Sequence, residues 1–342
     1  INTDAVDNSG GVDCSDHEVN LKIFMQHLTE VGAIPSRAER DRILAAVSGE
    51  VCDAVLADNR AQSLALSLDQ RRSAGDLEAY FSLAVRLVDV GLLDREGEAF
   101  PSESVVRARP RPLLTRPELA ILMAYAKMQL YQGLLDSDLA QDPGTKSFLI
   151  DYLPPSLRER FAGRMLEHPL ARELVATVVA NRIVNQGGSA LVQTLVRKCA
   201  ADPVAIVTAY LALDRILVGD SLRQALRQKE TGLTVEGVYE ILLHLEDLLA
   251  DLIQDCLASG ISLSLAEDEL IRLRQRSDIL LSGLATTLSP VRYGRCRAAA
   301  TALEKGGLPP ASSWRLAALA EARDELRAAL LAAFSTLTRK NL

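Results

Sequence analysis

Aromatic residues are scarce in this chain of 342 residues, where they make up only 4% of the sequence. Sheets draw heavily on aromatic and β-branched residues, so this scarcity disfavours a protein built on sheets. Leucine and alanine, both strong helix formers, account for 58 and 46 residues. A chain that is 48% hydrophobic also has enough side chain to bury, which excludes intrinsic disorder. We therefore expect a mostly α-helical globular protein.

Other features are absent as well. No apolar run approaches the roughly 18 residues that a membrane helix needs, so we expect no membrane partner. The 45 acidic residues outnumber the 38 basic ones, which argues against a nucleic-acid partner. The cysteines are widely spaced and form no Cys-x-x-Cys pair, and no histidines stand at metal-ligand spacing. We expect no disulfide framework, no metal site and a reduced, cytoplasmic compartment.

The helical body carries no recognisable catalytic signature. It has no Gly-x-Gly-x-x-Gly loop, no Walker loop and no Gly-x-Ser-x-Gly elbow, so we assign no catalytic residue. One apolar helical stretch places Asn181 and Asn185 one turn apart on the same face. Buried amides need hydrogen-bond partners, so a satisfied structural pair is favoured over a ligand site.

The segment before residue 19 is polar and glycine-containing, and a helical period follows it. Ser15 with Glu18 three residues later predicts a capping box that opens a helix running to about His27. Backbone N–H groups at a helix N-terminus stabilise an anion, and the Ser15 hydroxyl could reach the same anion. An ordinary turn and cap is the alternative, and the residues alone favour it.

The same segment resembles a known family. The spacing is that of a glutamate dehydrogenase motif, Asn8-x-Gly10-Gly11-Val12-x-x-Ser15-x-x-Glu18. Further segments resemble the very large bacterial NAD-specific glutamate dehydrogenases, and these are Asn2-Thr3-Asp4-Ala5, Arg116-Pro117-Glu118-Leu119-Ala120, Leu134-Leu135-Asp136-Ser137-Asp138-Leu139 and Ala176-Thr177-Val178-Val179-Ala180-Asn181-Arg182. The resemblance covers most of the chain, and its segments occur in the same order.

The resemblance implies specific roles at the matching positions. Asn8 would lie beside the nicotinamide of NAD, and Ser15 would bind the side-chain carboxylate of glutamate. Gly10 and Gly11 would allow the cofactor to approach the backbone closely. The full-length protein would convert L-glutamate to 2-oxoglutarate and ammonium.

The family's catalytic lysine and aspartate, its substrate lysines and its dinucleotide loop have no match here. We therefore expect a C-terminal piece that is inactive alone and partners an upstream catalytic region of the same polypeptide. The first twenty or so residues would be the tail of an α/β dinucleotide-binding catalytic domain.

The predicted division of the chain has four parts. Residues 1–35 end the catalytic domain, 36–95 form a helical segment, 96–114 a linker, and 115–342 a helical C-terminal domain. The linker is expected to be extended, with solvated arginines.

Helices that look apolar on several faces, at 204–217 and 241–253, favour a homo-oligomer, although burial within one chain explains the same pattern. Cleft support and effector binding are further possible roles of the helical body. The alternative reading of the whole chain is an independent all-helical scaffold or interaction module, with an accidental match at its N-terminus.

Overall fold

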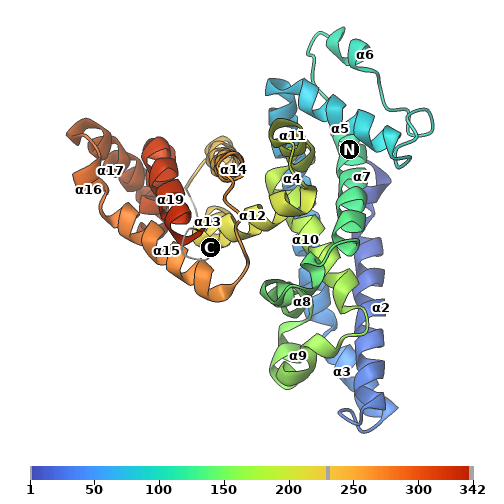
Figure 1. Cartoon of the computed structure of the whole chain (residues 1–342). Helices are drawn as coiled ribbons and strands as arrows, with labels where there is room; N and C mark the ends of the chain where they lie inside the picture. The colour runs from blue at the N-terminus through green and yellow to red at the C-terminus, as the bar shows by residue number, and fades with distance from the viewer. Residues whose placement is uncertain (1, 229–231, 339–342) are drawn as a thin grey trace. The chain divides into compact units, whose positions relative to one another are not determined.

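The computed structural model describes residues 2–228 and 232–338, and every regular element in these ranges is a helix (Figure 1). The predicted mostly α fold is confirmed. The chain divides into two compact units, Ile1–Thr194 and Leu195–Leu342, called unit 1 and unit 2 below. None of the described helices combines the length and apolar character needed to cross a bilayer.

Unit 1 contains two long helices, α2 and α4, against which α1, α3, α5, α7 and α10 pack. Its elements are α1 (Asp4–Asp7), α2 (Ser9–Glu30), α3 (Arg37–Ala46), α4 (Ser48–Gly75), α5 (Leu77–Asp89), α6 (Glu103–Arg107), α7 (Arg116–Leu135), η1 (Leu139–Gln141), η2 (Pro143–Thr145), α8 (Lys146–Tyr152), α9 (Pro155–Arg160), η3 (Ala162–Glu167) and α10 (Ala171–Gly187). Helix α11 (Leu191–Cys199) begins near the end of this unit.

Local sequence signals set several helix ends. Thr115 and Glu118 form a capping box at the start of α7, which satisfies free backbone donors of that helix. Gly188, with φ of +94°, stops α10 in a conformation that glycine adopts at little cost.

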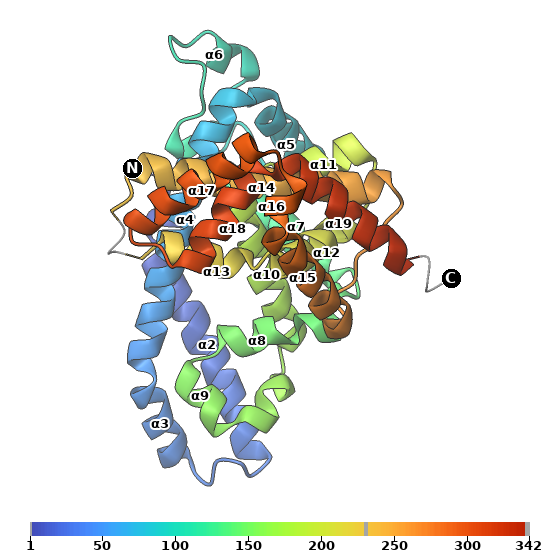
Figure 2. The same cartoon turned by 90° about the vertical axis from the view of Figure 1, so that its left-hand side faces the viewer.

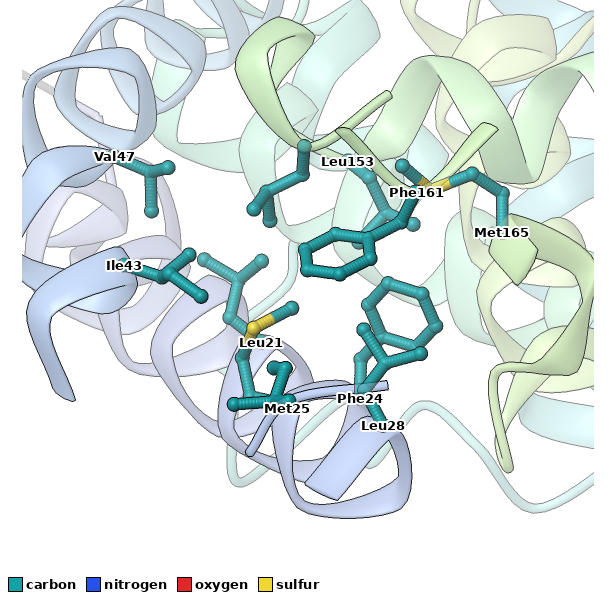
Figure 3. Close-up of a cluster of buried hydrophobic side chains, with 11 residues drawn as sticks. Leu21, Phe24, Met25, Leu28, Ile43, Val47, Leu153, Phe161 and Met165 are labelled. Atoms are coloured by element: carbon teal, nitrogen blue, oxygen red, sulfur yellow. The ribbon is translucent and has the colours of Figure 1, made fainter. Parts of the chain in front are cut away.

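The C-terminal half of α2 lies on an apolar cluster (Figure 3). Leu21, Phe24, Met25 and Leu28 project from one side of α2 and are almost fully buried. Their partners come from α3, from the α8–α9 turn, from α9 and from η3, and they are Ile43, Leu153, Leu157, Phe161 and Met165. In Figure 2, α3 and α9 lie around this end of α2, and α6 lies at the opposite end of unit 1.

The segment predicted as an extended linker is folded. It contains α6, and its Val106 and Leu114 side chains are buried. The arginines are also engaged, because Arg107 pairs with Glu103, and Arg109 binds Glu118 with 2.6 Å between Nη2 and Oε1. The prediction of solvated arginines was wrong at Arg109, which is partly buried against Glu118, whereas Arg107 is exposed.

Unit 2 is built around α12, which is buried along most of its length. Its helices are α12 (Pro203–Ile216), α13 (Gly219–Leu226), α14 (Val235–Ala258), α15 (Glu267–Ser282), α16 (Leu284–Thr287), α17 (Pro290–Lys305), α18 (Pro310–Glu321) and α19 (Arg323–Thr338). The apolar faces at 204–217 and 241–253 are explained largely by burial inside this unit.

A buried polar network ties three helices of unit 2 together. Arg223 of α13 donates from Nη1 to Asp214 Oδ1 over 2.6 Å and from Nε to Glu246 Oε1 over 2.8 Å. Tyr210 donates to Glu246 Oε2 over 2.6 Å. The network is satisfied within the unit, which fits a structural role.

The compact units group residues differently from the predicted ranges. Residues 115–194 belong to unit 1, because α7 and α10 pack against α4. The predicted ranges also state which residues belong to the catalytic domain of the full-length protein, and that division stays a prediction.

Candidate functional site

Asn8 stands between the first two helices. It ends α1 and is also the N-cap of α2, with φ of −99° and ψ of 11°. Its backbone N–H donates to Asp4 O over 2.8 Å, but its side chain makes no capping bond. The Asn8 amide is exposed, so its polar atoms are available to a ligand.

Helix α2 begins earlier than the sequence predicted. It starts at Ser9, so Ser15 lies two turns inside the helix rather than at its N-cap. The predicted capping box of Ser15 and Glu18 is wrong, and so is the anion site built on a helix N-terminus at Ser15. Two adjacent glycines suggested a turn, but both residues are helical in this context.

Three of the four predicted ligand residues share one face of α2. Positions three, four and seven apart lie on the same side of a helix, which places Asn8, Gly11 and Ser15 in one row. All three are exposed, and the Ser15 hydroxyl makes no hydrogen bond to the described residues. Val12 lies in the same row with 59% of its surface exposed, which gives the row an apolar wall.

The two glycines differ in their surroundings. A Cβ on Gly11 would lie 2.9 Å from Asn8 Oδ1, so the Asn8 side chain occupies the space that a side chain at position 11 would fill. Nothing lies within 4 Å of a Cβ on Gly10. Because residues two apart on a helix do not face each other, Gly10 points away from the row of Asn8 and Ser15.

The opposite side of α2 carries polar residues that face the body of unit 1. The His17 ring is buried and stacks on Tyr152, with 4.6 Å between ring centroids. Tyr152 donates to Asp16 Oδ2 over 2.8 Å and accepts from Asn20 Nδ2 over 2.9 Å. These contacts fix the rotation of α2 about its axis, so the row with Ser15 faces outward.

A second group of residues near α2 is titratable and partly buried, and it consists of Asp13, Asp58 and Lys127. Burial lowers the pKa of Lys127 to about 8, against the opposite influence of the Asp58 and Asp13 charges. Burial raises the pKa of Asp13 and of Asp58, and the Asp58 charge raises the pKa of Asp13 further. Within the described residues, the buried Oδ2 of Asp13 and Nδ1 of His17 have no hydrogen-bond partner. Sequence reasoning missed this group, since its members are scattered over α2, α4 and α7.

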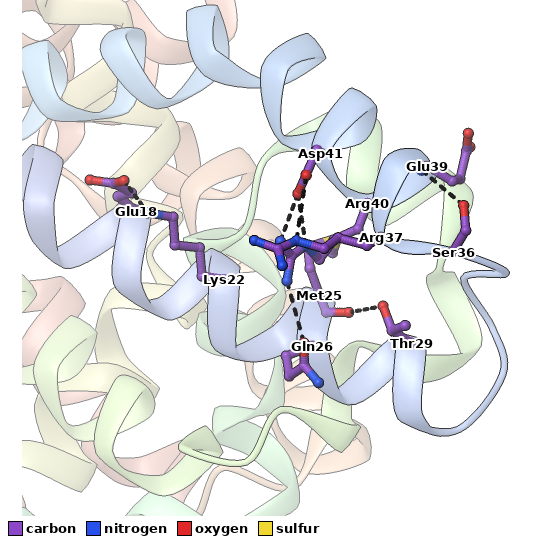
Figure 4. Close-up of polar contacts among 10 residues, drawn as sticks. All are labelled: Glu18, Lys22, Met25, Gln26, Thr29, Ser36, Arg37, Glu39, Arg40 and Asp41. Atoms are coloured by element: carbon purple, nitrogen blue, oxygen red, sulfur yellow. Dashed lines mark hydrogen bonds and ion pairs between the residues drawn. The ribbon is translucent and has the colours of Figure 1, made fainter.

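Nearer its C-terminus, α2 is held at its surface by polar contacts (Figure 4). Arg40 of α3 donates to Gln26 Oε1 over 3.3 Å, and Glu18 pairs with Lys22 along α2 itself. The pair of Glu18 and Lys22 is exposed, so it contributes little to stability.

A cavity of about 800 Å³ opens between α5, α7 and α10. Asn181 and Lys127 line it, whereas Asn185 is buried and its Oδ1 has no partner among the described residues. The predicted satisfied pair of Asn181 and Asn185 is therefore wrong, because the two amides lie in different surroundings.

The described residues provide no candidate metal site. The described residues contain no group of three or more His, Cys, Asp or Glu side chains placed to bind a metal ion.

Comparison with protein families identifies the chain. A model described as glutamate dehydrogenase, C-terminal, matches residues 112–339, roughly two thirds of the sequence. The chain belongs to this glutamate dehydrogenase family. A second model, described as the catalytic domain of bacterial NAD-glutamate dehydrogenase, matches residues 1–69 and includes the whole of the exposed row on α2.

Individual proteins that are similar to this chain share one name. Proteins called NAD-specific glutamate dehydrogenase are 39% identical over 213 residues in Halomonas elongata, 38% over 218 in Mycobacterium tuberculosis and 37% over 212 in Pseudomonas aeruginosa. These alignments cover 62%, 63% and 61% of this chain. The chain spans only about 13% of the length of each relative.

The exposed row on α2 fits a nicotinamide cofactor on one structural ground. A side chain at position 11 would displace the Asn8 side chain from its present position. The Asn8 amide is exposed there, so it can form hydrogen bonds with a carboxamide.

Proposed function

We propose that this chain is the C-terminal part of an NAD-dependent glutamate dehydrogenase that oxidatively deaminates L-glutamate to 2-oxoglutarate and ammonium. The observation that supports this most strongly is the exposed row on α2, in which Asn8, Gly11 and Ser15 lie together within the segment matched by the catalytic-domain model. The independent scaffold is disfavoured, because family models match both residues 1–69 and residues 112–339.

Each residue of the row has a separate task in this proposal. The Asn8 amide contacts and orients the nicotinamide, while the Ser15 hydroxyl donates a hydrogen bond to the side-chain carboxylate of glutamate. Gly11 leaves free the space in which the Asn8 amide lies beside the cofactor, whereas Gly10 points to another side of α2. NAD, when bound, accepts a hydride from the substrate. The upstream catalytic region supplies the remaining groups, so the chain alone is inactive.

Location and assembly are further parts of the proposal. All five cysteines are free, which suits the reducing conditions of the cytoplasm. A homo-oligomer is supported by exposed valines on α5, where Val85 is 54% and Val88 38% exposed. Light scattering on the full-length protein tests the assembly, and a monomeric mass would contradict it.

Replacement of Ser15 by alanine tests the substrate site. A hydrogen bond to a charged carboxylate contributes about 1.5–3 kcal/mol. We therefore expect Ser15→Ala in the full-length enzyme to raise the KM for glutamate roughly ten- to hundred-fold and to leave the KM for NAD nearly unchanged. Steady-state kinetics measure both constants.

The exposed Ser282 of α15 provides a matched control, since Ser282→Ala also removes a hydroxyl from a helix surface. An unchanged KM for glutamate in Ser15→Ala would refute the assignment of this residue. Absence of glutamate-dependent NAD reduction in the full-length wild type would refute the proposed function itself.

A further inference from the structure

The two residues that flank Asn8 are both attached to the helical body. Asp7 accepts from the Asn2 backbone N over 3.0 Å and from Asn2 Nδ2 over 2.7 Å. Arg116, the first residue of α7, donates from Nε to Asn2 Oδ1 over 3.0 Å. Asp7 is thus connected through Asn2 to a helix more than a hundred positions later in the chain.

Arg116 is itself fixed by a second helix. Its Nη1 donates to Ser67 Oγ over 2.8 Å and its Nη2 to Ser63 O over 3.2 Å, both on α4. A guanidinium whose three nitrogens each donate to a different acceptor has little freedom to turn, so it holds Asn2 in one place.

The residue after Asn8 is held independently. Asn59 of α4 donates from Nδ2 to Ser9 Oγ over 2.7 Å and lies 3.4 Å from Val6 O. Ser9 and Val6 are each only 2% exposed. The turn between α1 and α2 is therefore anchored on both sides of Asn8, while the Asn8 side chain itself stays exposed.

We propose that Arg116 and Asn59 are positioning residues that hold the Asn8 amide toward the nicotinamide, so that α4 and α7 support the catalytic cleft. This inference rests on the proposed function. It also explains why two segments that carry the family resemblance, at 2–5 and 116–120, meet in space. Arg116 belongs to one of those segments, whereas no motif in the sequence marks Asn59.

The test uses the full-length enzyme with Arg116→Gln or Asn59→Leu. A misplacement of about 1 Å at a reacting group can cost on the order of 100-fold in rate. We expect each variant to raise both the KM and the calorimetric dissociation constant for NAD by about ten-fold or more. The KM for glutamate should change less than about two-fold, because the part of α2 that carries Ser15 is held separately, by the contacts of Tyr152 with Asp16 and Asn20.

Matched variants separate positioning from loss of stability. Arg109→Gln breaks an ion pair with Glu118 at the same end of α7 and touches none of residues 2–9, so NAD binding should stay near wild type. Arg116→Lys keeps a donor and should restore part of the affinity. Asp7→Ala changes an exposed residue and should reproduce the NAD defect even if the other variants fold poorly.

The outcomes distinguish the inference from the function on which it rests. Unchanged NAD binding in Asp7→Ala and Arg116→Gln, or an equal rise in both KM values, would overturn the positioning role while the active wild type upholds the dehydrogenase. A wild type without activity would overturn both.

Discussion

At the scale of single residues, the role of Gly11 in the motif depends on the side chain of Asn8. Its φ is ordinary for a helix, so glycine is not required there for backbone freedom. A Cβ at position 11 would instead crowd the Asn8 side chain, whose Oδ1 lies 2.9 Å from the position that the Cβ would take. The two glycines of the motif are thus not equivalent, although the sequence presents them as a pair.

Replacement of Gly11 by alanine tests this reading. The new methyl group would displace the Asn8 amide, so we expect Gly11→Ala in the full-length enzyme to raise the KM for NAD about ten-fold or more. Folding should be retained, because alanine favours the helical state by about 1 kcal/mol over glycine. Gly49, the second residue of α4, has open space around it, and Gly49→Ala should leave the kinetics unchanged.

At the scale of secondary structure, the junction of α10 and α11 depends on buried polar contacts with α4. Asp69, fully buried, accepts from Ser189 N over 3.0 Å and from Ser189 Oγ over 2.7 Å. Arg72 donates to Asp69 over 3.0 Å and to Gln186 O over 3.0 Å. Gly188 lies against both side chains and has a positive φ.

Gly188→Ala should therefore destabilise unit 1. A Cβ at this position would lie 2.5 Å from Asp69 Oδ1, and the strained backbone adds of the order of 1–3 kcal/mol. We expect a loss of about 2 kcal/mol or more in the free energy of unfolding, measured by urea denaturation of the 342-residue chain. Gly75, at the end of α4, has open space and no positive φ, so a similar loss in Gly75→Ala would contradict this explanation.

At the scale of the molecule, buried histidines make the stability of unit 1 depend on pH. His168 is 3% exposed, and its Nδ1 accepts from Leu170 N over 3.0 Å. Its Nε2 lies 3.0 Å from Asn20 O, to which it can only donate. This pattern suits the neutral ring, and burial lowers the pKa of His168 and also of His17.

The chain should consequently lose stability on acidification. A histidine whose pKa is lowered by folding stabilises the native state above its unfolded pKa of about 6.5, and this contribution is lost as the pH falls through the histidine range. We expect the Tm of the 342-residue chain to fall between pH 7.5 and pH 5. His168→Gln should reduce that slope, and a slope identical to that of wild type would exclude His168 as a source.

The sequence by itself determined the helical fold, several helix ends and the motif that marks the family. Helical periodicity, the Thr115 capping box and the stop at Gly188 are local, so neighbouring residues suffice to predict them. Sequence did not place Ser15 inside α2, and it did not bring Asn59 and Arg116 to either side of Asn8. Those features depend on contacts between residues up to 114 positions apart, and only the packing of α2, α4 and α7 decides them.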